Sequence, residues 1–304
     1  MEKKFGLVID ITRCDGCGSC MLSVKDEYSG NNYPGYAAEI PEHVFPMNLK
    51  EVVQGQGYKI KMDYIPKMFP HNRNLDISRI PGEVPEGAIY VREDGLTVID
   101  PEKAKGCRNI YEYLKELYPD PDIVTWNEEL EIPQIYTLDA HRMDEGEKYP
   151  RCVEDCPTQA MHWGDLNDPE SDVSKFIASH PGEIEDIYSE EGADFVVRYY
   201  KLPKPFIAGE VTTADESDVL TEVRVTLTEK STGQIIVTET DFMGDFQFKY
   251  LKQGEEYTVQ VDGCEAIDVI LDEAKNLGVI AVPDKIEAEE KVAVRKEAAR
   301  EIGR

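Results

Sequence analysis

Three closely spaced cysteines near the amino terminus constrain this chain more than any other feature. They follow the pattern C-x2-C-x2-C, and their thiols are those of Cys14, Cys17 and Cys20. In the bacterial run C-x2-C-x2-C-x3-C-P a fourth cysteine would follow, but here that place holds Val24, which cannot bind a metal. Three thiolates in one short loop are typical of iron–sulfur proteins, because sulfur ligands suit the iron–sulfur core.

The fourth ligand is expected far downstream, at Cys156. The segment Cys152-x3-Cys156-Pro157 has the end pattern of a second run, and in two-cluster ferredoxins the cysteine before the proline binds the other cluster. Cys156 should therefore complete the early set and close one [4Fe-4S] cluster. Zinc on the same thiols, or an empty site, is the alternative, and the tight spacing favours the cluster.

The remaining cysteines are expected to be buried thiols and not ligands. They are Cys107, Cys152 and Cys264. Cys107 holds the second place of another C-x2-C-x2-C pattern, in which Ala104 and Ile110 occupy the other two places. One thiol cannot hold a cluster, so the cysteines support a single [4Fe-4S] site. The odd total of seven cysteines also does not fit a secreted disulfide framework.

Charge and hydrophobicity limit the possible partners. The formal net charge is -28, and an acidic surface repels phosphate groups, so we expect no nucleic-acid and no membrane partner. Every apolar run is shorter than the roughly 20 residues that cross a bilayer. The apolar run at 5–11 is too short for a signal peptide and no Arg-Arg pair occurs, so we expect a cytoplasmic protein unless a partner's signal exports it.

The pattern of segments indicates an α+β domain over residues 1–202. Residues 29–90 are rich in Pro, Gly, Asn and Tyr, and we expect them to be mostly loop. The regular elements expected in this domain are strands at 5–11 and 160–164, a hairpin at 89–99, and helices at 21–28, 110–117 and 168–192.

An all-β domain is expected over residues 203–283, after the segment Pro203-Lys204-Pro205. Short alternating segments such as Val223–Leu227 and Tyr257–Val261 lie between turn residues, a pattern typical of a small β-sandwich. The domain holds no recognisable nucleophile–base pair. The tail, residues 284–304, is rich in Ala, Glu and Lys and is expected to be a surface helix or a frayed end.

Several stretches of the chain resemble one known family. Besides the early cysteine run, they are Tyr33–Tyr36, Val91–Gly106, Trp126–Glu129, Pro150–Cys152, Asp241–Phe248 and Gly254–Val259. These stretches resemble the iron–sulfur subunits of molybdopterin oxidoreductases of the dimethyl sulfoxide reductase family. Within it, the likeness is greatest to the small subunits of transhydroxylases that act on hydroxylated aromatic compounds.

The resemblance implies a ferredoxin-like iron–sulfur domain followed by a transthyretin- or immunoglobulin-like sandwich. It also implies a heterodimer, in which a large catalytic subunit carries molybdopterin with molybdenum or tungsten and this chain has no catalytic residues. Members of this family hold several clusters. Here Tyr136 and Asp139 fall where two cysteines of a second cluster would stand, which leaves Cys152 without partners.

Three functions are compatible with these features. The first is a non-catalytic subunit of a molybdenum or tungsten bis-pterin enzyme for a small hydroxylated aromatic substrate, whose cluster has a structural or accessory redox role. The second is a working electron-transfer subunit of a reductive, for example dehydroxylating, molybdoenzyme. The third is a stand-alone binding module that uses its sandwich. The chain itself does not name the substrate, because chemistry would take place on the partner.

Overall fold

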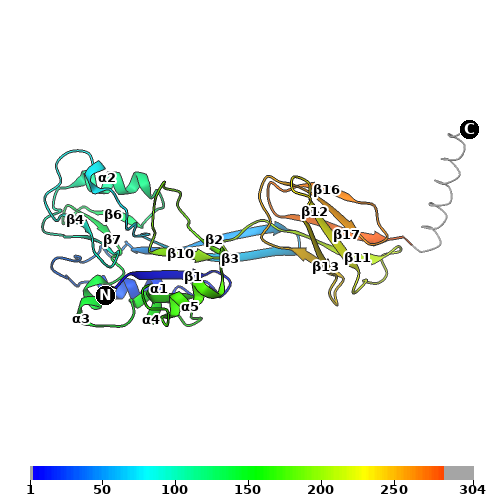
Figure 1. Cartoon of the computed structure of the whole chain (residues 1–304), viewed down its shortest axis with the longest axis horizontal. Coiled ribbons are helices and arrows are strands. Elements are labelled where there is room, and N and C mark those ends of the chain that lie inside the picture. Colours follow the sequence, from blue (N-terminus) through cyan, green and yellow to red (C-terminus); the bar gives the residue numbers. More distant parts are fainter. Residues whose placement is uncertain (1–2, 284–304) are drawn as a thin grey trace, which may run out of the picture. The chain divides into compact units, whose positions relative to one another are not determined.

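The computed structural model describes residues 3–283, and the chain divides into two compact units (Figure 1). The first unit contains the residues up to Val52 together with Asp63–Leu202. The second contains Val53–Met62 and the residues from Pro203 onward. The expected tail, residues 284–304, lies outside the described residues. No helix among residues 3–283 is long and apolar enough to cross a membrane.

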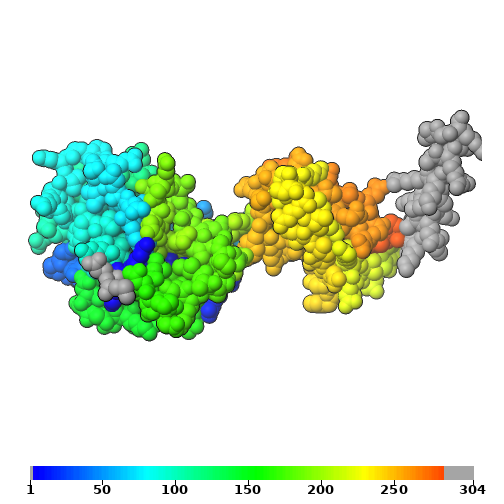
Figure 2. Space-filling view, viewed as in Figure 1, coloured from blue at the N-terminus to red at the C-terminus, as the bar shows by residue number. Residues whose placement is uncertain are grey.

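A four-stranded sheet forms the centre of the first unit. Its strands, in order across the sheet, are β8 (Met161–Asp165), β1 (Phe5–Asp10), β10 (Val197–Tyr200) and β9 (Ile184–Glu185). β1 runs parallel to β10 and antiparallel to β8, and all six of its residues are buried. A continuous apolar run is what a strand covered on both faces requires. In Figure 2 the blue amino-terminal segment is largely covered by green and cyan parts of this unit.

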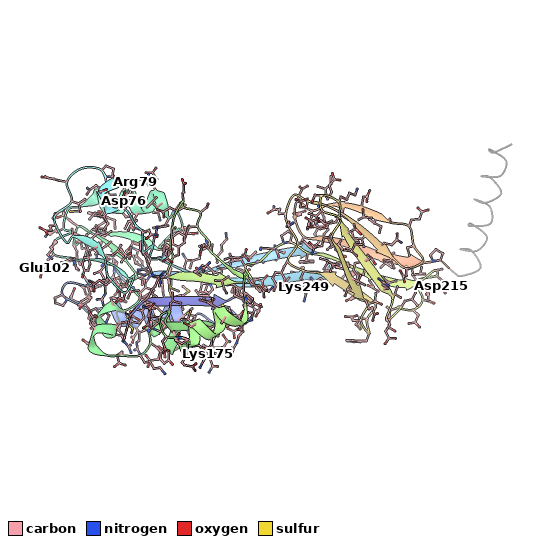
Figure 3. The ribbon with its side chains drawn as sticks, viewed as in Figure 1. Asp76, Arg79, Glu102, Lys175, Asp215 and Lys249 are labelled. Carbon is pink, nitrogen blue, oxygen red and sulfur yellow. The ribbon has the colours of Figure 1, made fainter. Side chains whose placement is uncertain are left out.

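Short helices and hairpins surround this sheet. The helices are α1 (Ser19–Tyr28), α2 (Arg108–Leu117), α3 (Ala140–Glu145), α4 (Arg151–Glu154), α5 (Asp172–Ser179) and the 3-10 turn η1 (Ile77–Arg79). The hairpins pair β4 (Ile89–Val91) with β5 (Thr97–Ile99), and β6 (Val124–Asn127) with β7 (Ile132–Ile135). α1 packs against α4, which brings two segments far apart in the sequence together. Charged side chains such as Glu102 and Lys175 are exposed on this unit (Figure 3).

The first unit has two hydrophobic cores. One surrounds β1 and includes Leu7, Val24 and Tyr136. The other surrounds α2 and includes Phe69 and Tyr118. Both cores are made of side chains that are almost completely shielded from solvent.

Several parts of the first 202 residues differ from the sequence prediction, which also lacked α3, α4, β9, β10 and the hairpin of β6 and β7. The stretch 29–90 is loop over more than half of its length, as expected, but it also contains a two-stranded ribbon of β2 (Met47–Gln56) and β3 (Lys59–Met68) that was not predicted. A glycine in β2, Gly55, and a proline in β3, Pro66, obscured the strand pattern. The helix expected at 168–192 shortens to α5, since Pro181 and Gly182 follow its last turn and end it. The predicted strand at 5–11, the hairpin at 89–99 and the helix at 110–117 are confirmed within a few residues.

The second unit contains two sheets that share one hydrophobic core. The three-stranded sheet has the order β14 (Asp245–Phe248), β11 (Ile207–Thr213), β17 (Lys275–Val282). The four-stranded sheet has the order β13 (Ile235–Glu239), β12 (Arg224–Glu229), β15 (Glu256–Val261), β16 (Ile267–Ile270). Val211 from the first sheet and Leu227 and Val259 from the second lie in the same core. Inward-facing apolar residues alternate with outward-facing ones along β12 and β15, as two packed sheets require.

Candidate metal centre

The early cysteine loop starts where the buried strand β1 ends. Asp10, the last residue of β1, turns the chain, since its Oδ1 accepts hydrogen bonds from the backbone N and the hydroxyl of Thr12 at 2.9 and 2.6 Å. Gly16 and Gly18 both have φ of 75°, the left-handed conformation that glycine adopts at little cost. The loop then enters α1. This path leaves Cys14 half-buried, Cys17 exposed and Cys20 buried.

Cys156 lies at the same end of the sheet, because β8, which follows it, runs antiparallel to β1 and begins beside the end of β1. Cys156 follows α4, and its backbone N donates to the carbonyl oxygen of Val153 at 3.3 Å. The next residues lead into β8, where the backbone N of Asp10 donates to the carbonyl oxygen of Ala160 at 2.7 Å. The hydroxyl of Ser23 in α1 also donates to the carbonyl oxygen of Arg151 at 3.3 Å. These contacts join the segment of Cys156 to both ends of the early loop.

The four predicted thiols lie within electrostatic range of one another. Burial, together with negative charge on Cys14, Cys156 and Cys17, raises the pKa of Cys20 to about 12. The pKa of Cys14 is also raised, first by burial and then by Cys156 among other charges. Four thiolates so placed repel each other. Their ionised forms therefore need a positively charged group, such as a metal, between them.

Backbone N–H groups point at three of these sulfurs. The backbone N of Ala160 donates to Sγ of Cys156 at 3.3 Å. Hydrogen bonds from the backbones of Gly16 and Met21 favour the thiolates of Cys14 and Cys20, since each lowers the pKa of the thiol that accepts it. Cysteine ligands of iron–sulfur clusters accept such bonds, and these bonds tune the cluster's potential. This set of soft donors therefore fits an iron–sulfur core.

The distances between the predicted ligand atoms are relevant to whether the site would bind zinc instead of an iron–sulfur cluster. Among residues 3–283, no group of three or more His, Cys, Asp or Glu side chains is close enough to hold a single metal ion. A tetrahedral zinc ion, with bonds of about 2.3 Å, would need its sulfurs about 3.8 Å apart. A cubane places a different iron behind each thiolate, so its cysteine sulfurs stand further apart.

The other cysteines of the first unit lie in its two cores. Cys152 is completely buried, forms a hydrogen bond with the side chain of Tyr136, and has a pKa that burial raises far above its usual range. Cys107 lies in the core around α2 together with Ala104 and Ile110. In the second unit, the half-buried Cys264 donates to the carbonyl oxygen of Ala281 at 3.7 Å.

Replacing Cys152 with alanine should leave the iron content unchanged. The substitution removes a buried thiol and its hydrogen bond to Tyr136, so we expect the free energy of unfolding to fall by about 1–2 kcal/mol. Iron analysis and thermal unfolding of the variant check both expectations. Loss of iron from this variant would contradict the assignment of Cys152 as a non-ligand.

The ring of Tyr64 covers the cysteine loop at Gly16, a feature that the sequence did not reveal. A Cβ at Gly16 would lie 2.6 Å from Cγ of Tyr64, closer than real atoms approach. Gly18 has the same φ, but a Cβ there would meet no heavy atom within 4 Å. Substituting each of the two glycines therefore separates the effect of backbone strain from the effect of contact with the Tyr64 ring.

Gly16→Ala should destabilise the first unit more than Gly18→Ala. Both variants place alanine in the left-handed region, at a cost of roughly 1–2 kcal/mol. Only Gly16→Ala must also displace Tyr64, which should add roughly 1–3 kcal/mol. Thermal unfolding and iron content of both variants measure the difference. Equal losses of stability in the two variants would show that the ring of Tyr64 moves aside at no cost.

A second group that sequence reasoning missed is centred on Glu27 at the end of α1. Its carboxylate accepts from the hydroxyl of Tyr33 at 2.8 Å and lies 3.0 Å from both Nε2 of His141 and Nε of Arg151. The ring of His141 stacks on Tyr33. No spacing in the sequence connects these residues, because they come from α1, a loop, α3 and α4. The group ties α1 to the helices that precede Cys156.

Three known proteins are similar in sequence to this chain over most of their own length. The chain is 28% identical over 298 residues to the pyrogallol hydroxytransferase small subunit of Pelobacter acidigallici, covering 91% of this chain and 99% of that one. It is 31% identical over 218 residues to a putative dimethyl sulfoxide reductase iron-sulfur subunit of Halobacterium salinarum, covering 62% of this chain and 76% of that one. With a tetrathionate reductase subunit of Salmonella typhimurium it shares 27% identity over 206 residues, which cover 67% and 75% of the two chains.

Protein-family models and solved structures add no evidence on the family of this chain. No protein-family model matches the chain. A partial likeness to the major pilin subunit of Bacillus cereus, with a TM-score of 0.23, 10% identity and coverage of 29% of this chain and 32% of that one, carries no argument. The relatives with matching sequence agree with one another and with the thiol-rich site. The chain belongs to the family of iron–sulfur subunits of dimethyl sulfoxide reductase-type molybdoenzymes.

Proposed function

We propose that this chain is a non-catalytic subunit that holds one [4Fe-4S] cluster on Cys14, Cys17, Cys20 and Cys156. The observation that carries the proposal is the convergence of a loop after β1 with a segment after α4, which places these thiols within electrostatic range. The cluster would supply a one-electron redox centre and a covalent tie between the two segments. The protein's own contribution is to hold the thiolates and direct N–H groups at them.

The remaining positions support a count of one. Tyr136 and Asp139, with Val24, occupy places where ligands of a second cluster would stand, and all three are completely buried. Ala104 and Ile110 flank Cys107 in a hydrophobic core. Tightly packed side chains fill these positions, so a cluster there would need both new ligands and new space.

For the fold, we propose that the first unit is ferredoxin-like and the second is a transthyretin- or immunoglobulin-like sandwich. Support for the first is the pair of cysteine segments that meet beside one sheet, as they do in ferredoxins. The shared core of the two sheets in the second unit supports the sandwich.

We propose that the partner is a large molybdenum or tungsten bis-pterin subunit acting on a hydroxylated aromatic compound. The support is the likeness to the pyrogallol hydroxytransferase small subunit along nearly its whole length. A hydroxyl transfer has no net electron flow, so a single cluster with a structural or accessory redox role would suffice. A row of clusters, which long-range conduction needs, has no place in this chain.

An electron-transfer role in a reductive, for example dehydroxylating, enzyme is the second candidate. The exposed side chain of Cys17 favours it, because the cluster edge behind that sulfur would be open to an external electron donor. A redox titration of the complex followed by electron paramagnetic resonance (EPR) separates the two roles. Reduction and reoxidation of the cluster at the turnover rate would establish the second role. Full activity with the cluster held in one oxidation state would establish the first.

Metal analysis of the natively purified protein tests the proposal itself. We expect about four iron and four sulfide atoms per chain, and co-purification of a large pterin-containing subunit. About eight iron atoms per chain, or zinc in place of iron, would overturn the cluster assignment. Isolation of the native chain with no large subunit would favour the stand-alone binding module.

A further inference from the structure

The place of a second cluster is filled by a buried network. Val24, Tyr136, Asp139 and Cys152 stand where its ligands would be, and each has an exposed fraction of 0%. Tyr136 and Cys152 are joined by a side-chain hydrogen bond. A buried carboxylate is costly unless hydrogen bonds satisfy it, so the partners of Asp139 decide what this network does.

The carboxylate of Asp139 accepts three hydrogen bonds from three separate segments. Its Oδ1 accepts from the hydroxyl of Tyr28 at 2.7 Å. Its Oδ2 accepts from the hydroxyl of Tyr136 at 2.9 Å and from the backbone N of Arg151 at 2.7 Å. Tyr28 is the last residue of α1 and Arg151 is the first of α4. One side chain therefore links α1, the segment before α3, and α4.

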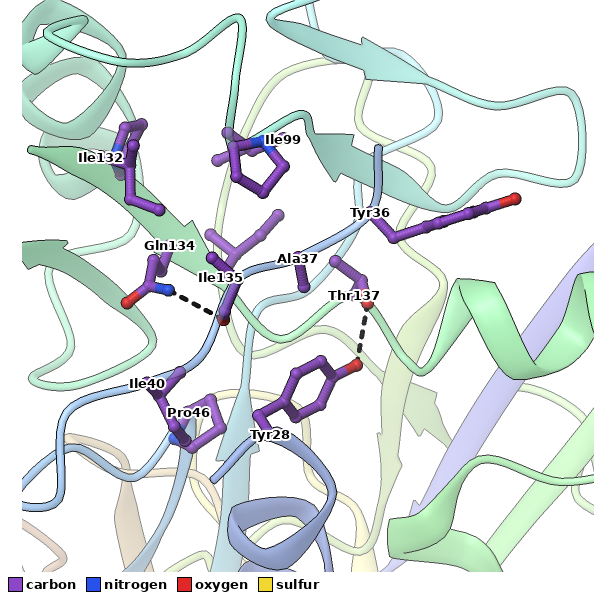
Figure 4. A pocket seen from close by; sticks show the side chains of 13 residues that line it. Tyr28, Tyr36, Ala37, Ile40, Pro46, Ile99, Ile132, Gln134, Ile135 and Thr137 are labelled. Carbon is purple, nitrogen blue, oxygen red and sulfur yellow. Dashed lines mark hydrogen bonds between the residues drawn. The ribbon is translucent and has the colours of Figure 1, made fainter. Parts of the chain in front are cut away.

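The surroundings of this network leave it no room for a bound cofactor. The hydroxyl of Tyr28 also lies 3.0 Å from Oγ1 of Thr137 (Figure 4). The cavity on this side holds only about 20 Å³, enough for one water. The network is thus a compact joint buried from solvent, and hydrogen bonds in such surroundings are strong.

This joint bears directly on the fourth ligand. α4 begins at Arg151 and leads straight to Cys156, whose backbone N is bonded to Val153 in α4. In a two-cluster protein, a second cluster bound to Cys152 would tie this same turn to the early run. Here the carboxylate of Asp139 provides that tie.

We propose that Asp139 is a positioning residue that replaces the lost second cluster and holds the Cys156 thiolate on the remaining one. The inference rests on the proposed function, since it concerns how the single cluster is retained. Asp139 does not touch the cluster; it acts through Arg151 and α4. Without it, the iron bound by Cys156 should be the one released most readily.

Mild oxidation of the purified complex tests this role. With ferricyanide as oxidant, [4Fe-4S]2+ gives [3Fe-4S]+, one Fe2+ and one electron, which reduces ferricyanide to ferrocyanide. The three-iron product is followed by EPR, and the freed thiol is trapped with iodoacetamide. We expect Asp139→Ala to convert roughly tenfold faster than wild type, with Cys156 as the labelled thiol. Asp139→Asn keeps an acceptor for the backbone N of Arg151 and should convert at nearly the wild-type rate.

Matched variants control for general destabilisation. Asp100→Ala removes another buried carboxylate, which accepts from the backbone N of Glu102 at 3.0 Å, and should convert at the wild-type rate. If Asp139→Ala does not fold, Tyr136→Phe removes one hydrogen bond to the carboxylate and should still convert several-fold faster. Tyr118→Phe, which loses a buried hydroxyl bonded to Glu190, is its control.

The outcomes separate this inference from the proposed function. Conversion of Asp139→Ala at the wild-type rate, or labelling of a thiol other than Cys156, would overturn the role of Asp139 and leave the cluster assignment intact. Equal acceleration in Asp100→Ala would also overturn it. A wild-type complex without a [4Fe-4S] cluster would overturn the proposed function instead.

Discussion

Replacing Cys156 with alanine should abolish the iron–sulfur chromophore and weaken the first unit by several kcal/mol. Cys156 is the one proposed ligand outside the early loop, so its loss leaves three thiolates with nothing opposite them. The free energy of cluster binding contributes to folding, because the site ties the loop after β1 to the segment after α4. The variant should therefore lose visible absorption, iron and thermal stability together.

Two other cysteine variants serve as references for this result. Cys264→Ala lies in the second unit and should change neither iron content nor the unfolding of the first unit. Cys152→Ala lies on the same turn as Cys156, so it separates loss of a ligand from disturbance of α4. Wild-type iron in Cys156→Ala would show that this cysteine is not a ligand.

Acid should destabilise the first unit through His71. This side chain is completely buried, and burial, more than any other cause, lowers its pKa from 6.5 to about 3. Below pH 6.5, His71 becomes protonated in the unfolded chain but stays neutral in the native state. Stability is therefore full above that pH and falls by about 1.4 kcal/mol per pH unit down to pH 3, a total on the order of 4–5 kcal/mol.

The variant His71→Asn should remove most of this dependence. His71 has φ of 51°, a conformation that asparagine tolerates well, and asparagine can still accept from the backbone N of Thr97, which now donates to Nδ1 at 3.0 Å. Denaturant unfolding between pH 7.5 and 4.5, followed by tryptophan fluorescence, reports on this unit because both Trp126 and Trp163 lie in it. Equal pH slopes for the two proteins would show that His71 is not the group responsible.

Under the proposed function, two places that the family resemblance assigns to further clusters hold other structures, namely hydrophobic side chains around Cys107 and a hydrogen-bonded joint around Asp139. Hydrophobic packing can replace a cluster as a source of stability, because both remove the ends of several segments from solvent. Neither can replace it as an electron carrier, which is why we favour an accessory role for the remaining cluster.

Local patterns in the sequence predicted only part of the regular elements of the first unit. The apolar run of β1, the Asp94-Gly95 turn between β4 and β5, and the periodic residues of α2 each identify their own structure. The ribbon of β2 and β3 was missed because Gly55 and Pro66 are unusual in strands. Its middle residues, Val53–Met62, also belong to the second unit, a long-range association that no local pattern encodes.

The sequence by itself determined which thiols are the candidate metal donors, since thiol identity and the spacing of Cys14, Cys17 and Cys20 are covalent properties of a short segment. Only the tertiary structure decided that the backbone of Asp10 meets that of Ala160 and so places Cys156 beside this loop. It also decided that Asp139 joins α1 to α4. These contacts join residues that are far apart in the sequence. They form only once the whole chain has folded, because burial and hydrogen bonding depend on which distant segments meet.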